Sequence, residues 1–206
     1  MTLLDSGGKM EKEHLKIFAK FNKESNDSMN NIIKTLTDEQ WKKQFSGYYK
    51  SILEICGHIY FWDYNTLVRF KSIRNYSYLD EFQYEKDLDI FTLRITEEGQ
   101  EYLHENFTSS KSLFSNSSIA EYLKMRIDLD NRMVKLVNEI TESDLTKVIN
   151  LTTITGNKFE KSLGGLLFEI FVHDIHHRGM ISLYLEMLGK ENDFYSDPCQ
   201  VFWSYK

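Results

Sequence analysis

The sequence predicts an all-α fold, a four-helix bundle that forms a single domain over residues 1–206. Four amphipathic segments of similar length account for most of the chain. A single proline in the whole chain leaves these segments free to form long helices. With 41% apolar and 27% charged residues, the composition is that of an ordinary globular protein large enough to bury a core.

The four helices are predicted from apolar side chains that recur at intervals of three and four residues. Thr37 and Gln40 have the spacing of a capping box, which ends the first helical segment and starts a new turn. Arg126 is the single charged residue in the inward row of the third helix, and Gly189 is a suitable C-cap for the fourth. The predicted helices cover about residues 10–36, 46–73, 117–140 and 161–188.

A small β-hairpin and a long insertion complete the predicted fold. β-Branched residues flank Gly156-Asn157 just before the last helix, a pattern typical of two short strands joined by a turn. The insertion, about residues 74–115, separates the second and third helices and greatly exceeds the roughly 2–8 residues of an ordinary helix connection. We expect a short helix over 97–107, in a segment that forms a packed excursion, a subunit contact or a lid over a pocket. Residues 190–206 form a C-terminal tail.

Charge, hydropathy and cysteine content exclude several classes of partner. The net charge of −6 and the pI of about 5.6 argue against nucleic acid, because an acidic surface repels phosphates. No run approaches the roughly 20 apolar residues of a membrane span, and the amino terminus lacks the pattern of a signal peptide. Cys56 and Cys199 are too few for a disulfide framework, and the apolar context of Cys56 predicts a buried thiol. We therefore expect a cytoplasmic protein with neither a nucleic-acid nor a membrane partner.

The last helix contains three histidines within "FVHDIHHRGM", residues 171–180. His173 and His177 lie on its inward row, and at 100° per residue their side chains point about 40° apart, one turn above the other. A buried imidazole without a partner costs about 1–3 kcal/mol, and one divalent cation would satisfy both rings. Two hydrogen-bonded structural histidines would show the same spacing, so both interpretations stay open. His176 points 60° and 100° away from the other two, which favours a structural or pocket-lining role.

A metal needs a ligand from a second helix, and His58 in "ICGHIYFWDYNTL" is the best candidate. It borders the apolar face of the second helix, next to Gly57, which permits close approach of another backbone. Glu169 precedes His173 by one turn, so we expect it to accept a hydrogen bond from an imidazole or to act as a further ligand. Asp174 is available to a neighbouring helix.

Three features occur together in this chain: a histidine midway along the second helix, the inward His-x-x-x-His-Arg-Gly of the last helix, and the hairpin before it. In this combination the chain resembles the DinB family of DinB/YfiT-like metalloenzymes over about residues 10–190. The resemblance implies a homodimeric four-helix bundle with His58, His173 and His177 as ligands of a divalent metal. Zinc or nickel is the most frequent ion, with iron and manganese as further candidates. Members often have Asn and Gln where this chain has Val172 and Met180, a difference that concerns the substrate and leaves the ligand set intact.

The resemblance also directs the functional prediction. Relatives include thiol S-transferases that use low-molecular-weight thiols, and metal-dependent hydrolases. We expect thiol S-transferase chemistry on a small-molecule substrate, with a metal-dependent hydrolase as one alternative and a non-catalytic, stress-related bundle with a structural metal or none as another. Asp63 or Glu169 would act as a base. Arg126 would bind a substrate carboxylate, or else form an ion pair with Asp130 one turn later.

Overall fold

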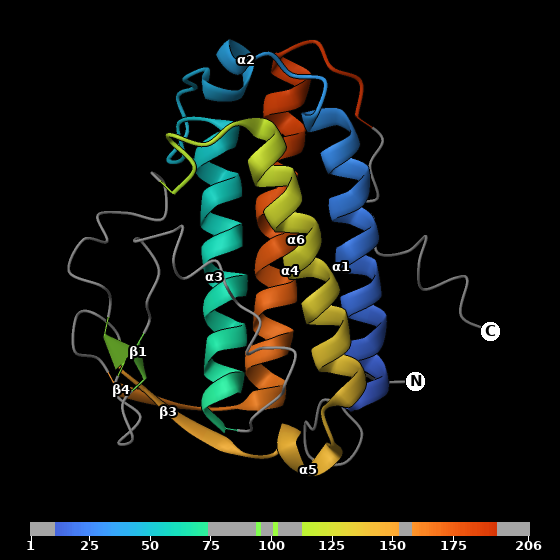
Figure 1. Cartoon of the computed structure of the whole chain (residues 1–206), viewed down its shortest axis with the longest axis vertical. Helices are drawn as coiled ribbons and strands as arrows, with labels where there is room; N and C mark the ends of the chain where they lie inside the picture. The colour runs from blue at the N-terminus through green and yellow to red at the C-terminus, as the bar shows by residue number, and fades with distance from the viewer. Residues whose placement is uncertain (1–10, 74–93, 96–100, 103–112, 153–157, 193–206) are drawn as a thin grey trace.

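The computed structural model describes residues 11–73, 94–95, 101–102, 113–152 and 158–192. Four long helices lie side by side in a bundle (Figure 1), which confirms the predicted fold class. Two short helices, α2 (Asp38–Lys42) and α5 (Glu142–Leu145), lie at opposite ends of it. Within the described residues, no helix combines the length and the hydropathy that a bilayer span requires. The four bundle helices are α1 (Lys12–Ile33), α3 (Ile52–Ile73), α4 (Ile119–Glu139) and α6 (Leu163–Met187).

The direction of the helices accounts for part of the long insertion. In Figure 1, α1 and α6 run one way along the bundle, and α3 and α4 both run the other way. The chain that leaves α3 must therefore return to the opposite end before α4 begins. The 22 residues of α3 span about 33 Å at 1.5 Å per residue, which a connection of a few residues cannot cover. A long crossover is thus a requirement of this topology.

Within the insertion, the described residues form a small strand pair. β1 (Arg94–Ile95) pairs with β2 (Glu101–Tyr102) in antiparallel fashion. The helix predicted over 97–107 is therefore wrong at Glu101–Tyr102, and its remaining residues lie outside those described. The predicted roles of the insertion as a lid or subunit contact likewise fall mostly on residues outside the described ranges.

The predicted hairpin leads directly into the last helix. β3 (Val148–Thr152) pairs with β4 (Lys158–Ser162) in antiparallel register. The Gly156-Asn157 turn lies outside the described residues. At the end of β4, the Ser162 hydroxyl accepts a hydrogen bond from the backbone N–H of Gly165 at 3.1 Å and so caps α6. The hairpin and this cap together fix where α6 begins.

The ends of the other helices follow from local signals, with one correction. Thr37 and Gln40 form the predicted capping box, and Gly189 has the positive φ, 70°, expected after a helix. The second long helix begins at Ile52 instead of Ser46. The residues before it form a tight loop, in which a Cβ on Gly47 would lie 2.0 Å from the Tyr184 hydroxyl oxygen. This loop places the Tyr49 ring against His58 of α3 and His177 of α6.

The buried face of α6 differs from the row that the apolar spacing predicts. Asp174 and Arg178 are fully buried at its centre, with exposed fractions of 0%. At 100° per residue, His177 points about 60° and His173 about 100° away from Asp174. His177 is 6% exposed, and the side chain of His173 is 24% exposed. The two histidines therefore lie at the border of the buried face, where α6 meets α3.

Candidate metal centre

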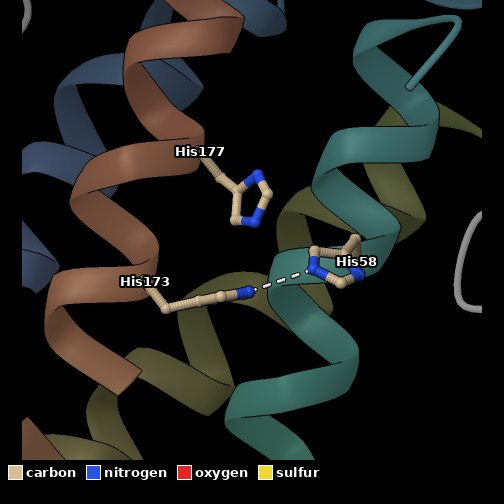
Figure 2. A group of neighbouring side chains, drawn as sticks. All are labelled: His58, His173 and His177. Carbon is tan, nitrogen blue, oxygen red and sulfur yellow. Dashed lines mark hydrogen bonds between the residues drawn. The ribbon is translucent and has the colours of Figure 1, made fainter. Parts of the chain in front are cut away.

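Three imidazoles from two helices converge at this border. His58 projects from α3 and His173 and His177 project from α6 toward one another (Figure 2). One ring nitrogen of each residue lies within 4.8 Å of the corresponding nitrogens of the other two. The Nε2 atoms of His58 and His173 are 3.0 Å apart. The structure thus brings together the three histidines that the sequence singles out as ligands.

The donor set fits a divalent transition metal. Nitrogens placed tetrahedrally at 2.0–2.1 Å from zinc lie about 3.3 Å from each other, close to the His58–His173 separation. Nδ1 of His177 is buried and lacks a hydrogen-bond partner. Burial, followed by the nearby His173 and His176, lowers the pKa of His177 to about 4, so this imidazole is neutral at pH 7. A neutral imidazole is the form that binds metal.

Aromatic side chains surround the cluster. The Tyr49 ring centroid lies 4.8 Å from that of His58 and 5.3 Å from that of His177, and Trp62 contacts His58 and His173 at 6.2 and 6.4 Å. The Tyr184 hydroxyl donates to the Tyr49 carbonyl at 2.7 Å, which holds the loop against α6. Burial raises the pKa of Tyr49 to about 12, so its phenol stays neutral. No local sequence signal indicates Tyr49, because it reaches the centre from a loop.

Arg126 lies inside the core, away from solvent. Its NH1 group is 2.6 Å from Asp63 Oδ2, and its NH2 group is 2.6 Å from Asp130 Oδ1. The ion pair with Asp130 is the alternative left open by the sequence, and Asp63 joins it as a second partner. The side chains of Arg126 and Asp63 are each 1% exposed. The predicted roles of Arg126 in binding a substrate carboxylate and of Asp63 as a base are therefore not supported, because each engages the other in the core.

Glu169 does not join the histidines. Its carboxylate pairs with Lys161, and its side chain is 57% exposed. At 100° per residue Glu169 points about 140° away from Asp174, the centre of the buried face, and so toward solvent. The structure therefore does not place Glu169 as the predicted ligand, base or imidazole acceptor, because the apolar row that includes its side of the helix is rotated relative to the buried face. His176 is exposed, with its ring centroid 4.9 Å from that of His177.

Asp174, and not Glu169, is the carboxylate that lies beside a candidate ligand. Its Oδ1 lies 3.6 Å from Nδ1 of His173, and its Oδ2 accepts a hydrogen bond from Asn22 of α1 at 2.8 Å. Burial acts to raise the pKa of Asp174, but His173 and Arg178 outweigh it, and the pKa lies below its ordinary value. Asp174 is therefore an ionised carboxylate beside a candidate ligand.

Comparisons with known proteins relate the chain to a family and to a fold. A model of the DinB family matches residues 10–197. One similar solved structure is that of YfiT from Bacillus subtilis, which is described as a probable metal-dependent hydrolase with an unusual four-helix bundle topology. Its sequence is 16% identical to this chain, the TM-score is 0.60, and the match covers 91% of this chain and 95% of that one. A DinB-like protein from Bacillus cereus ATCC 10987 is 18% identical with a TM-score of 0.43, covering 85% and 93% of the two chains. No curated protein matches the chain.

Proposed function

Because the chain belongs to the DinB family, we propose that it is a metal-dependent enzyme that transfers a low-molecular-weight thiol to a small-molecule electrophile. The observation that carries this proposal is the convergence of His58, His173 and His177 at the partly exposed edge of the bundle. Three neutral donors leave the full charge of a divalent ion uncompensated, which favours an anionic fourth ligand.

The chain's own residues prepare the centre for such a ligand. His177 is neutral at pH 7 and binds a metal without first releasing a proton. Tyr49 and Trp62 cover the ligand rings with aromatic surface and restrict the access of water. The 24% exposure of the His173 side chain leaves one side of the cluster open. A divalent ion bound at this centre would hold a thiol as its thiolate, the nucleophilic form.

Among the residues that the structure describes, no carboxylate is placed to act as a base at the cluster, which supports thiol transfer over hydrolysis. Among the described residues, Asp63 is paired with Arg126 in the core, and Glu169 is paired with Lys161 at the surface. The remaining carboxylate near the cluster, Asp174, faces His173. Activation of water for hydrolysis commonly uses a positioned base, whereas a thiol loses its proton readily near a cation.

Of two alternatives, one has an observation in its favour and the other does not. The similarity to YfiT, described as a probable metal-dependent hydrolase, favours hydrolysis of a small molecule. A non-catalytic bundle with a structural metal would require a closed fourth position, and Glu169, the expected occupant, lies at the surface. That placement favours an enzyme.

The decisive experiment measures metal content and then turnover. Elemental analysis should find about one equivalent of zinc or nickel in the wild type and much less in the His173→Ala/His177→Ala double variant; equal content would eliminate the metal centre. The metal-loaded protein should then consume a thiol in the presence of an alkylating electrophile, with loss of activity on chelation. Hydrolysis of ester or amide substrates without consumption of thiol would instead support the hydrolase alternative.

A further inference from the structure

Asp174 and Asn22 form a contact between α6 and α1 that ends at a candidate ligand. Asp174 is 0% exposed and Asn22 is 3% exposed, so both polar groups are removed from solvent. Asn22 Nδ2 donates to Asp174 Oδ2 at 2.8 Å. The other carboxylate oxygen, Oδ1, lacks a hydrogen-bond partner and lies 3.6 Å from Nδ1 of His173. The carboxylate therefore has one oxygen fixed by α1 and the other directed toward the ligand histidine.

Arg178 determines how Asn22 is oriented. Its NH1 group donates to Oδ1 of Asn22 and, at 3.1 Å, to Oδ1 of Asn26. A guanidinium has only donors, so it must face the amide oxygen of Asn22, and the amide N–H then faces Asp174. The orientation of the Asn22 amide thus follows from hydrogen-bonding chemistry. Arg178 thus fixes the Asn22 amide, and Asn22 in turn fixes the Asp174 carboxylate.

An acceptor beside Nδ1 has a defined effect on an imidazole. The proton of the neutral ring is favoured on Nδ1, and the lone pair is left on Nε2, the atom 3.0 Å from Nε2 of His58. Nδ1 of His173 forms no hydrogen bond at the 3.6 Å separation, but it faces a carboxylate, whereas among the described residues no carboxylate lies beside Nδ1 of His177. Of the two candidate ligands on α6, His173 is the one whose ring is oriented from the core.

We propose that Asp174, clamped by Asn22, is a positioning residue that orients His173 for metal binding and so links α1 to the metal centre. This inference rests on the proposed metal site. It assigns to α1, which supplies no ligand, a part in determining metal affinity. Removal of such an outer carboxylate typically lowers metal affinity about 10–100-fold.

The chain offers a matched control for this proposal. Asn26, one turn after Asn22, donates to Asp130 Oδ1 at 2.9 Å, and Asp130 is 2% exposed. Asp130 thus resembles Asp174 in burial and in its asparagine partner, but it pairs with Arg126 instead of a ligand histidine. Substitution of either aspartate by asparagine removes one buried charge. In Asp174→Asn the amide oxygen stays with the N–H donor of Asn22, so the NH2 group faces His173, and only this variant replaces the acceptor beside Nδ1 by a donor.

The test is a zinc titration against a chromophoric chelator. We expect Asp174→Asn to weaken zinc binding about 10–100-fold and Asp130→Asn to change it less than about threefold. An equal loss in both variants, or none in Asp174→Asn, would overturn the inference while the wild type still binds zinc. A wild type that binds no zinc would overturn the proposed function as well. Nitrogen-15 NMR of the metal-free wild type provides a readout independent of variants, since His173 should carry its proton on Nδ1, and a proton on Nε2 would contradict the proposal.

Discussion

Replacement of Arg126 by methionine tests whether this residue holds the core together or binds a substrate. The substitution keeps much of the side-chain volume but leaves Asp63 and Asp130 without their cation, and both are almost fully buried. Breaking a buried ion pair by removing one partner costs about 3–5 kcal/mol, a large share of a total stability of roughly 5–15 kcal/mol. With a urea m-value of about 2–3 kcal/mol/M, the unfolding midpoint should fall by roughly 1–2.5 M.

The matched control is Arg132→Met on the same helix. Arg132 pairs with Asp128 four residues away at 2.7 Å, but its partner is 35% exposed, so the loss should stay below about 1 kcal/mol. Urea unfolding followed by circular dichroism measures both variants. Because protonation removes unpaired negative charge, the cost of Arg126→Met should also be smaller at pH 5 than at pH 8. Equal midpoints for the two variants, or an Arg126→Met protein of normal stability whose KM alone rises, would refute the structural role.

Three further predictions concern the metal ligands, the thiol and the surface. In metal-free protein the pKa of His177 is about 4 against 6.5 unfolded, so the folded state binds its proton less readily. The stability advantage of wild type over His177→Gln should be complete above pH 6.5 and decline by up to about 3 kcal/mol as the pH falls to 4; a constant difference in unfolding free energy would contradict this. Burial raises the pKa of Cys56 to about 12, so in a Cys199→Ser background iodoacetamide should label Cys56 only after denaturation, and rapid labelling of the native protein would show the thiol to be accessible. The homodimer implied by the family resemblance would use the outer face of α6, which carries four of the seven exposed large apolar side chains among the described residues. Light scattering should find that Val172→Glu gives a monomer while Ile127→Glu on α4, also 44% exposed, leaves the dimer intact; a monomeric wild type would contradict the dimer.

Local rules were sufficient for the helix caps and for the spacing of the two histidines on α6. The capping box at Thr37 depends on side chains three residues apart, and the C-cap at Gly189 depends on a single residue that tolerates positive φ. The pairing of His173 with His177 requires only that one turn of helix separates them. None of these features depends on how the helices are arranged around one another, and so they could be predicted from the sequence.

The orientation of α6 could not be predicted in the same way. Apolar periodicity assigns polar residues to the outside, but Asp174 and Arg178 lie at the centre of the buried face. The predicted row therefore lies beside Glu169, and the burial of Asp174 depends on a partner from α1 that the periodicity of α6 does not show. Tyr49 was missed for a different reason, since its position depends on a loop that Tyr184 holds. The sequence pattern also does not show that α3 and α4 run in the same direction, and it is this shared direction that requires the long crossover.

One signal in the sequence does indicate the buried polar contacts. Three polar pairs have a spacing of four residues and are buried in the structure: Asn22 and Asn26, Arg126 and Asp130, and Asp174 and Arg178. Buried polar groups require partners, and a spacing of one helical turn on three helices lets them meet at the same level. They do so through hydrogen bonds that join α1 to both α4 and α6.

The net charge of these buried groups is expected to change their protonation when a metal binds. Three buried carboxylates, Asp63, Asp130 and Asp174, face two guanidiniums, Arg126 and Arg178, which leaves one negative charge in excess if all are ionised. Burial raises the pKa of Asp63 well above its ordinary range, and protonation there would remove the excess. A cation at the histidine cluster would add positive charge beside Asp174 and would favour ionisation of the carboxylates in the core. Metal binding and the protonation of the core are therefore expected to be coupled through the same residues that orient His173.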